Sequence, residues 1–429
     1  MKIIQLNKES KQSILEDLLK RSPNHYSEYE KIVADIIEQV RERKDEAVFD
    51  YTEKFDQIRL SSQSVRVTEA EIESAMQKTE PEFLEIMRKA AKNIRAYHEK
   101  QLQNSWLDFQ ENGIILGQKI TPLSRVGIYV PGGKAVYPSS TLMCAVTAKV
   151  AGVEKIIITT PPGKDGTIHP SVLAAARIAG VDEIYKVGGA QAIAAMAFGT
   201  QSIPRVDKIV GPGNIFVALA KKSVFGYVSI DSVAGPSEIV VLADESANPR
   251  YVAADLLSQA EHDQLASGIC ITTSNDLALK ISAEVDRFLA ILPRADIMKA
   301  SLDQYGYILV AETMEEAIET VNEIASEHLE ILTSEPFAVL PKIKNAGAIF
   351  LGEYSSEPLG DYFAGPNHVL PTNGTARFFS PLGVDDFIKK SSVISYSREA
   401  LQEVHADIEY FARKEQLTAH ENSIKVRFE

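Results

Sequence analysis

Hydrophobic and polar residues follow two different patterns along the chain. From residue 1 to about residue 110, apolar positions recur at helical spacing among Glu, Lys, Gln and Ala, as in stretches 29–55 and 84–103. These stretches predict amphipathic helices, and the first of them is long enough for one helix or a pair. Thr68, followed by Glu71 three residues later, predicts the capped start of another helix.

Near Gly117 the pattern changes to short β-branched runs that alternate with helical stretches. The runs that predict strands are RVGIYV, KIIITT, EIYKVG, KIVGP, SEIVVLA, GICITT, YILVA, HLEILT and AGAIFLG. Strands alternating with helices are typical of parallel, doubly wound α/β structure. Because there are too many strands for one small sheet, we expect two α/β units with a break near residue 236, at the AGPSE turn.

After residue 375 the alternation ends. Stretch 378–392 is predicted to be extended or rich in turns, and 397–429 to be mostly helical and strongly charged. A segment this short cannot bury a core alone, so it is expected to pack on something else, with a second subunit as one candidate. The expected organisation is an N-terminal helical region (1–116), two α/β domains (117–236 and 237–375) and a C-terminal helical tail (376–429).

Composition narrows the class of protein. With 429 residues, 45% hydrophobic and 24% charged, the chain reads as a globular protein of more than one domain. Its net charge of −14 argues against nonspecific nucleic-acid binding. No apolar run is long enough for a membrane helix, and the first ten residues lack a secretory signal, so a cytoplasmic location is expected. Cys144 and Cys270, each among apolar residues, are predicted to be buried free thiols.

Four of the eight histidines are predicted to be unremarkable surface or helix-start residues: His25, His98, His169 and His405. The stretch SQAEHD is different. Gln259 and His262 are three residues apart on a predicted helix, so their side chains point the same way. This pair is either a solvated helix end or half of a metal site.

His328 directly follows Glu327 where a predicted helix meets the HLEILT strand. Adjacent helical residues point about 100° apart, so the two side chains converge only if the helix unwinds there. Ligands of parallel α/β proteins bind outside the carboxyl ends of strands. A helix-to-strand junction normally lies at the opposite edge, so that rule alone does not place this pair in a site.

Asp361 and His368 lie in a loop after the AIFLG strand, which is a favourable place for function. Their spacing leaves open which of them is a ligand. His420 lies in the tail, five residues after Glu415. Imidazole, carboxylate and amide donors together suit zinc, or manganese, iron or cobalt. Since Q-x-x-H is no recognised zinc motif, spacing alone leaves the metal open.

Three glycine-rich stretches each follow a predicted strand and open a helix: 129–140, 187–193 and 210–216. Backbone N–H groups at such turns suit a pyrophosphate. Neither G-x-G-x-x-G nor G-x-x-x-x-G-K-[ST] occurs in the chain, so a dinucleotide site there would be of a nonstandard kind. Taken singly, each stretch is equally typical of a tight turn in an α/β sheet.

Together these stretches resemble the histidinol dehydrogenase family. The resemblance rests, in this order from about residue 120 to the tail, on YVPGGKAVYPSS, VGGAQAIAA, VGPGN, AGPSE, LLSQAEHD, ASEHLEI, GDYFAGPNHVLPT and a terminal E-x-x-x-x-H. It implies two Rossmann-like domains and a homodimer with intertwined ends and shared active sites. It also implies an NAD-linked, zinc-dependent oxidoreductase of histidine biosynthesis, which oxidises L-histidinol to L-histidine through L-histidinaldehyde and reduces two NAD.

The resemblance also assigns roles to residues. The ligands of one zinc ion per subunit would be Gln259, His262, Asp361 and His420, the last from the partner chain. His328 would be the base for alcohol oxidation, and Glu327 would activate water for the aldehyde step. Histidinol would contact the zinc ligands, His328, Ser237 and Glu415. The NAD contacts would be Tyr129, Gln191 and Asn214, and His368 would have a supporting role.

Two other classes of function are compatible with the same residues. A zinc hydrolase would use Glu327 to activate a metal-bound water, and it would not bind NAD. A two-lobed ligand-binding protein without chemistry would leave the four candidate zinc ligands unexplained, and it would normally carry a signal peptide.

Overall fold

The computed structural model describes residues 1–21, 27–132 and 136–429. His25 and part of the glycine-rich stretch 129–140 therefore lie outside the described residues. The chain divides into two compact units, one made of Met1–Gln101 and Leu123–Phe387, the other of Leu102–Pro122 and Ile388–Glu429. These bounds differ from the four segments expected from the sequence, because long-range strand pairing joins distant parts of the chain. We describe each unit by itself.

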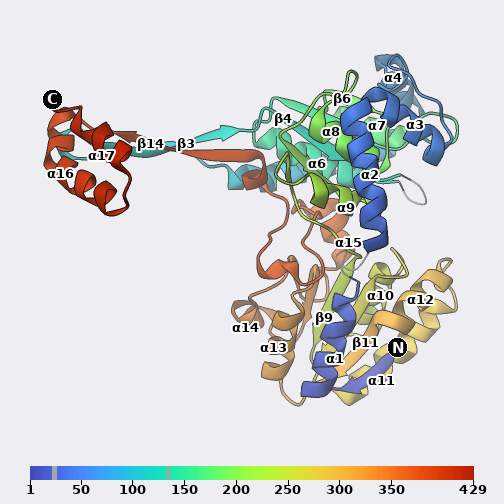
Figure 1. The fold of residues 1–429 in the computed structure, drawn as a ribbon. Helices are drawn as coiled ribbons and strands as arrows, with labels where there is room; N and C mark the ends of the chain where they lie inside the picture. Colours follow the sequence, from blue (N-terminus) through green and yellow to red (C-terminus); the bar gives the residue numbers. More distant parts are fainter. Residues whose placement is uncertain (22–26, 133–135) are drawn as a thin grey trace. The chain divides into compact units, whose positions relative to one another are not determined.

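The first unit contains two parallel sheets, and the smaller one forms the lobe that carries the glycine-rich stretches (Figure 1). Its strands lie in the order β6 (Glu183–Tyr185), β5 (Lys155–Thr159), β4 (Arg125–Tyr129), β7 (Lys208–Val210) and β8 (Ser229–Ile230). The helices that connect them are α6 (Pro138–Val150), α7 (Pro170–Ala179), α8 (Gly189–Phe198) and α9 (Ile215–Val224).

The second sheet has the strand order β1 (Lys2–Gln5), β11 (Gly306–Val310), β10 (Ser267–Thr272), β9 (Glu238–Ala243), β12 (His328–Leu332) and β13 (Ala348–Leu351). Alternate residues of its strands point into two cores, because successive strand residues face opposite sides. One core includes α10 (Pro249–Ala260), α11 (Asn275–Leu289) and α12 (Ala295–Tyr305), and the other includes α1 (Lys8–Leu19) and α13 (Met314–Ile324). Helices thus cover both faces, as predicted for a doubly wound sheet.

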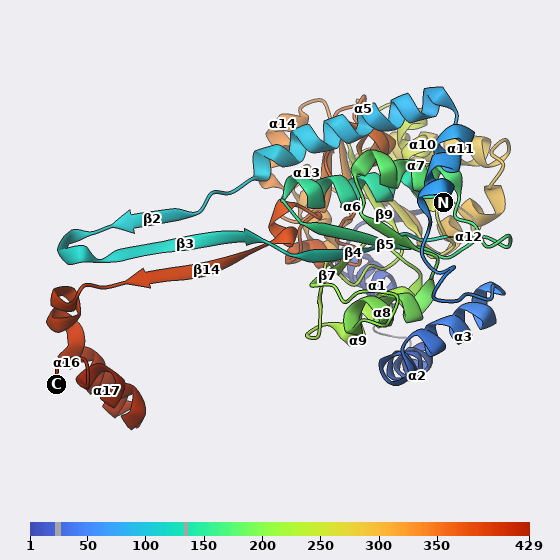
Figure 2. The same ribbon diagram turned by 90° about the horizontal axis from the view of Figure 1, so that it is seen from above.

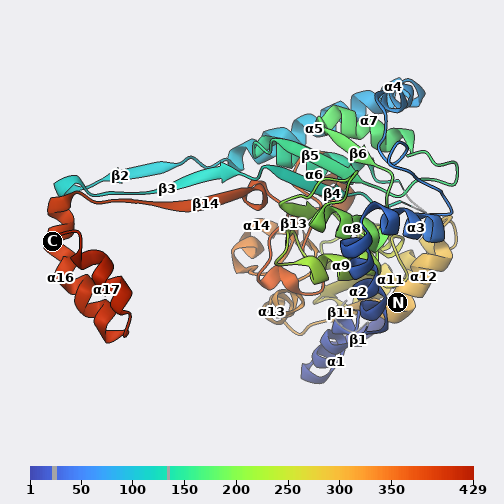
Figure 3. The ribbon, with the colours of Figure 1, turned by 45° about the horizontal axis from the view of Figure 1, so that its top comes forward.

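The N-terminal helices are present, but they are divided between the two lobes. β1 pairs with β11, and α1 packs in the core of the second sheet. α2 (Ser27–Arg43) packs on α8 and α9 of the first lobe, with α3 (Asp45–Asp56) beside it (Figure 3). α4 (Glu69–Lys78) and α5 (Pro81–His98) pack on α7 and α6. Stretch 29–55 is a pair of helices, separated at Lys44, whose φ is 57°. The capping box of Thr68 and Glu71 is confirmed.

The second unit is a three-stranded antiparallel sheet followed by two helices (Figure 2). Its elements are β2 (Trp106–Phe109), β3 (Ile115–Pro122), β14 (Ile388–Ser395), α16 (Arg398–Lys414) and α17 (Thr418–Lys425). Ala400 and Ala412 are its only buried residues, whereas the exposed fractions of Phe109 and Ile394 are 71% and 72%. This unit therefore has no apolar core of its own.

Several local predictions can be checked directly. Cys144 and Cys270 are buried and free, as predicted. His169 is exposed and caps the start of α7. The prediction for His98 is wrong. It lies on the buried face of α5, one turn after Ile94, and its Nδ1 is 2.8 Å from Oε1 of Gln101. Across the described residues, no helix combines the length and apolar content needed to cross a membrane.

Candidate active site

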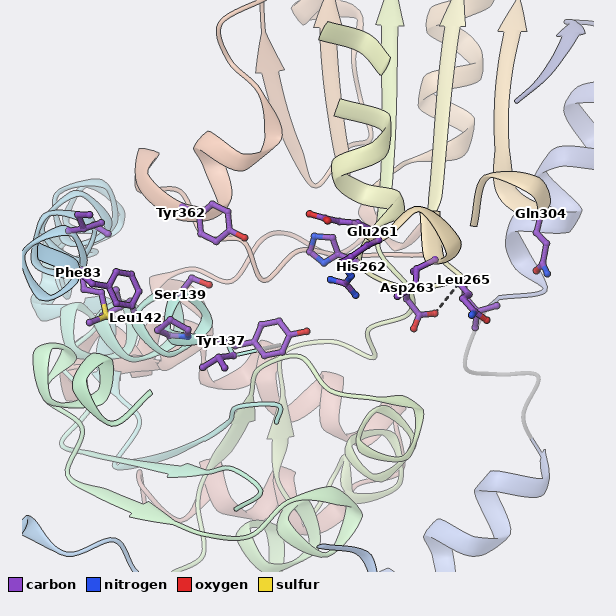
Figure 4. Close-up of a pocket in the computed structure, with 18 residues that line it drawn as sticks. Phe83, Tyr137, Ser139, Leu142, Glu261, His262, Asp263, Leu265, Gln304 and Tyr362 are labelled. Atoms are coloured by element: carbon purple, nitrogen blue, oxygen red, sulfur yellow. Dashed lines mark hydrogen bonds between the residues drawn. The ribbon is translucent and has the colours of Figure 1, made fainter. Parts of the chain in front are cut away.

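The two lobes of the first unit present opposite edges of their sheets to one pocket of about 860 Å³ (Figure 4). Tyr137 and Ser139 follow β4, so the first lobe contributes the carboxyl edge of its sheet. His262 lies in the turn between α10 and β10, so the second lobe contributes the amino edge. In Figure 4 the strands of the second sheet point away from the pocket. His328 and Asp361 line a second pocket, of about 790 Å³, together with His368. His328 begins β12, so it too lies at the amino edge of the second sheet, opposite to the edge that the binding-edge rule favours.

Glu327 and His328 converge because the helix before them ends early. α13 stops at Ile324, and Ala325 adopts a left-handed conformation with φ of 51°, so Glu327 lies in a bend just before β12 and His328 begins that strand. Glu327 Oε2 lies 3.7 Å from His328 Nδ1, and both residues are buried. The structure thus brings together the two residues that the sequence left apart.

The backbone N–H and the backbone carbonyl of Glu238 orient these two side chains. The N–H donates to Glu327 Oε2 at 2.9 Å, and the carbonyl oxygen lies 3.0 Å from His328 Nδ1. A carbonyl can only accept, so Nδ1 carries a proton and, in the neutral ring, Nε2 holds the lone pair. Nε2 is buried without a hydrogen-bond partner and lies 3.6 Å from Oδ1 of Asp361.

Burial and mutual repulsion set the pKa values of these groups. Burial raises the pKa of Glu327 to about 7. Burial alone would lower the pKa of His328, but the carboxyl groups of Glu327 and Asp361 outweigh it and raise that pKa to about 10. Burial and the charge of Asp361 raise the pKa of Glu357 to about 8. The pKa of Asp361 is lowered despite its burial, because His328 and His368 stabilise its ionised form.

The residues around Asp361 fit a divalent cation. One ligand atom each from His328, Glu357 and Asp361 lies within 4.8 Å of the others. Gln259 is buried in the last turn of α10, and its Oε1 has no hydrogen-bond partner. His262 follows three residues later. Desolvation lowers the pKa of His262, and the nearby charge of Asp361 opposes part of that effect. Oxygen and imidazole donors around excess buried negative charge suit zinc and related metals.

The sequence analysis missed Glu357. Asp361 lies in a π-helical turn, Gly360–Ala364, directly after the short helix α15 (Glu357–Leu359), and not in an irregular loop as expected. Glu357 and Asp361 are four residues apart, so they share one side of these turns. Ser258 Oγ donates to Glu357 Oε2 at 3.0 Å. The i, i+4 pairing of two acids was the signal that could have identified Glu357.

His368 holds the turn that carries Asp361. Its Nδ1 lies 2.9 Å from the backbone oxygen of Asp361, and its Nε2 lies 3.0 Å from Oγ of Ser140. Because both ring nitrogens are engaged, His368 is suited to positioning Asp361.

The three candidate NAD residues lie at the carboxyl edge of the first sheet. Tyr129 ends β4, and its hydroxyl accepts a hydrogen bond from the N–H of Gly189 at 3.0 Å. Gln191 lies in the first turn of α8, buried, with Oε1 unpartnered. Asn214 caps α9. Gly211, with φ of 111°, lies so close to Tyr129 that a Cβ atom would be 2.2 Å from its backbone oxygen. The edge thus has a buried, unpaired amide and closely packed backbone, which fit a dinucleotide.

The remaining predicted site residues are in different places. Ser237 immediately precedes β9 and is half-buried. Glu415 follows α16 and His420 lies in α17, so both belong to the second unit, in which both side chains are exposed. Their roles stay predictions.

Comparison with known proteins identifies close relatives. The family model described as histidinol dehydrogenase matches residues 19–428. Histidinol dehydrogenase from Geobacillus kaustophilus is 60% identical over 94% of this chain and 94% of its own length. Histidinol dehydrogenase from Caldanaerobacter subterraneus is 57% identical over 100% of this chain and 99% of its own length. The crystal structure of histidinol dehydrogenase from Elizabethkingia anophelis matches with a TM-score of 0.93 and 37% identity, covering 100% of this chain and 98% of that one.

Asp56, at the end of α3, provides a test of the electrostatics beside Tyr129. Burial raises the pKa of Tyr129 to about 12, with a contribution from Asp56, and burial raises the pKa of Asp56 to about 6. The folded protein then binds more protons than the unfolded one between pH of about 4 and 6, so stability falls as pH rises through that range. Asp56→Asn should stabilise the protein by about 1 kcal/mol at pH of about 8, and by much less below pH of about 4.

Urea unfolding of both proteins at the two pH values measures this difference. Asp50→Asn on the same helix is the control, since the Asp50 carboxylate is exposed and paired with Arg43. An equal effect of Asp56→Asn at both pH values would contradict the prediction.

Proposed function

We propose, from the premise that this chain belongs to the histidinol dehydrogenase family and is an oxidoreductase, that it oxidises L-histidinol to L-histidine through L-histidinaldehyde with zinc and two NAD. The observation that carries the proposal is the buried pair of Glu327 and His328 beside Asp361, oriented by the backbone N–H and carbonyl of Glu238. The pair supplies a carboxyl group and an imidazole for two successive oxidations at one carbon.

In the first step His328 acts as the base. An alcohol gives up a hydride only as its hydroxyl proton leaves, so a proton acceptor must face the hydroxyl group. Nδ1 of His328 is committed to the carbonyl of Glu238, which leaves Nε2 to accept that proton. The hydride leaves the carbinol carbon for NAD, and the product is the aldehyde. Nε2 is buried without a hydrogen-bond partner, so it is able to accept a hydrogen bond from the substrate hydroxyl group.

In the second step Glu327 activates water. An aldehyde has no second hydride to give until water adds to form the gem-diol. Glu327, whose pKa burial raises to about 7, takes a proton from the attacking water at neutral pH. The proton that His328 accepted in the first step passes to the aldehyde oxygen as water adds, which completes the gem-diol and leaves Nε2 free again. The gem-diol then loses a hydride from carbon to the second NAD and a hydroxyl proton to Nε2 of His328. The adjacency of Glu327 and His328 lets one substrate position serve both steps.

Gln259, His262 and Asp361, with His420 from a second copy of the chain, would hold one zinc ion per subunit. When bound, zinc would orient the imidazole and amine of the substrate, and its charge would offset the pull of the Asp361 carboxylate on the His328 ring. The unpartnered Oε1 of Gln259 supports this ligand set. Ser237 and Glu415 would add contacts to histidinol.

Tyr129, Gln191 and Asn214 would contact NAD, which accepts the two hydrides. The buried, unpartnered Oε1 of Gln191 and the close approach of Gly211 to Tyr129 support this position. A cytoplasmic location agrees with a biosynthetic role that depends on NAD.

A homodimer with shared active sites would complete this arrangement. The second unit has no apolar core, and it carries Glu415 and His420 on exposed positions. Its exposed aromatic and aliphatic side chains favour burial against another surface. In a symmetric dimer, each second unit would pack on the other copy of the chain in the same way.

The first prediction concerns reaction, cofactor and metal together. Purified protein with L-histidinol and NAD should form two NADH per histidinol, which the absorbance of NADH measures. A chelator should abolish the reaction and added zinc should restore it. A zinc-loaded protein that forms no NADH would contradict the proposal and favour the alternative function of a zinc hydrolase.

The second prediction separates the roles of the basic pair. His328→Asn should reduce oxidation of L-histidinol by roughly 10² to 10⁴-fold, while oxidation of added L-histidinaldehyde falls less. Glu327→Gln should slow the aldehyde step more than the alcohol step. Single-turnover NADH formation from each substrate measures the two steps. Equal losses in both steps for Glu327→Gln would contradict its role in hydration.

The third prediction tests the shared site. His262→Ala and His420→Ala should each be inactive. After subunit exchange, half of the dimers are mixed, and one of the two sites in each mixed dimer carries neither change. The mixture should therefore regain about a quarter of the wild-type activity. Either variant taken alone through the same exchange is the control. No recovery would place His420 in the site of its own chain.

A further inference from the structure

Both basic side chains are held by a single residue, Glu238. Its N–H donates to Glu327 Oε2 at 2.9 Å, and its carbonyl oxygen lies 3.0 Å from Nδ1 of His328. Glu238 begins β9, and β9 pairs in parallel with β12, which His328 begins. Any displacement of the Glu238 backbone therefore moves Glu327 and His328 together.

The side chain of Glu238 is fixed on two sides. It is almost fully buried and forms an ion pair with Arg21, which is buried to the same degree. Its other oxygen, Oε2, accepts a hydrogen bond from the N–H of Asn373 at 3.1 Å. A carboxylate with both oxygens occupied has little rotational freedom, so its backbone is held as well.

Arg21 reaches this position from the beginning of the chain. It follows α1, and its Nη1 donates to the backbone oxygen of Leu265 at 2.9 Å, while its guanidinium lies 5.1 Å from the centre of the Tyr305 ring. Leu265 belongs to the turn between α10 and β10 that carries His262. One guanidinium thus connects the His262 turn to the residue that orients Glu327 and His328.

A buried ion pair is not retained for its stability. The cost of removing two charges from water offsets most of their attraction, so neutral side chains of similar volume often serve a fold equally well. What the pair provides is geometry, because the planar guanidinium donates in fixed directions to Glu238 and Leu265 at once. Both groups lie beside the candidate site, since Leu265 lines the pocket of His262 and Glu238 contacts Glu327 and His328.

We propose that Arg21 and Glu238 are positioning residues for the oxidation, which act by holding the backbone N–H and carbonyl of Glu238 against Glu327 and His328. This inference rests on the roles proposed above for those two residues. Neither Arg21 nor Glu238 touches the reacting atoms through its side chain. Their effect is on the placement of the basic pair, to which proton transfer is sensitive within fractions of an ångström.

The inference makes a specific kinetic prediction. Because Glu327 and His328 both depend on the backbone of Glu238, loosening it should slow the alcohol and aldehyde steps by similar factors. The two catalytic variants, Glu327→Gln and His328→Asn, should instead slow the two steps unequally. The KM for L-histidinol and the zinc content should stay near wild-type values in Glu238→Gln, which leaves Arg21 in contact with the His262 turn through Leu265.

The experiment compares the full-length, zinc-loaded enzyme in three forms. Glu238→Gln keeps the size of the side chain but removes its charge. The double variant Arg21→Met with Glu238→Gln removes both charges, so that neither is left buried alone and the protein still folds. Asp182→Asn is the control, since it breaks ion pairs with Lys149 and Lys155 at the amino edge of the first sheet.

The expected result for the double variant, measured on zinc-saturated enzyme, is a 10 to 100-fold lower kcat in both steps with a roughly unchanged unfolding midpoint. Glu238→Gln should lose less, and Asp182→Asn should lose nothing. A folded double variant with kcat within about twofold of the wild type would overturn the proposal, as would a loss confined to one step.

The catalytic variants separate this failure from that of the proposed function. If His328→Asn and Glu327→Gln reduce turnover and the double variant does not, only the positioning role is wrong. If those two variants retain full turnover, the assigned roles of Glu327 and His328 are wrong, and the positioning role is wrong with them.

Discussion

A histidine buried among carboxyl groups is the physical constraint around which the site is built. Glu327, Glu357 and Asp361 surround His328, and desolvation opposes the charged form of every one of them. The protein relieves part of this cost by hydrogen bonds to backbone groups, such as those of Glu238. The rest is left as unsatisfied atoms, Gln259 Oε1 and His328 Nε2, which point to ligands that complete the site. Buried polar atoms without hydrogen-bond partners destabilise a core, and they are typical of a functional site.

The alternation of strands and helices was predictable because it depends on local periodicity. All nine predicted strands occur, from RVGIYV in β4 to AGAIFLG in β13. What local pattern could not predict is pairing across the sequence. KIIQ at residues 2–5 completes the second sheet beside β11, and β3 pairs with β14 across about 270 residues. For that reason the N-terminal helices were expected as a separate region, although they cover both lobes.

The candidate site shows the same division between local and distant information. Gln259 and His262 were found from spacing within one helical turn, Glu327, His328, Asp361 and His420 from their local settings, and the family resemblance assigned the roles. Glu357 was missed because Asp361 was expected in an irregular loop, where a spacing of four residues does not place two side chains on one side. His98 was misplaced because its neighbours in sequence are polar, whereas its side chain lies on the apolar face of α5. The roles of Arg21 and Glu238 are visible only in three dimensions, since 217 residues separate them.

If the proposed homodimer is correct, the second unit contributes to the energetics of the site. The three zinc-ligand candidates of the first unit are fixed by a large folded core, whereas Glu415 and His420 belong to a unit with almost no buried apolar side chains. A segment of that kind gains its order from the surface on which it packs. On the proposed dimer, the free energy that orders the second unit is the free energy of association, so the site is completed only when the subunits assemble. Catalysis and oligomerisation then depend on the same contacts, which explains why a tail without a core can carry residues for the reaction.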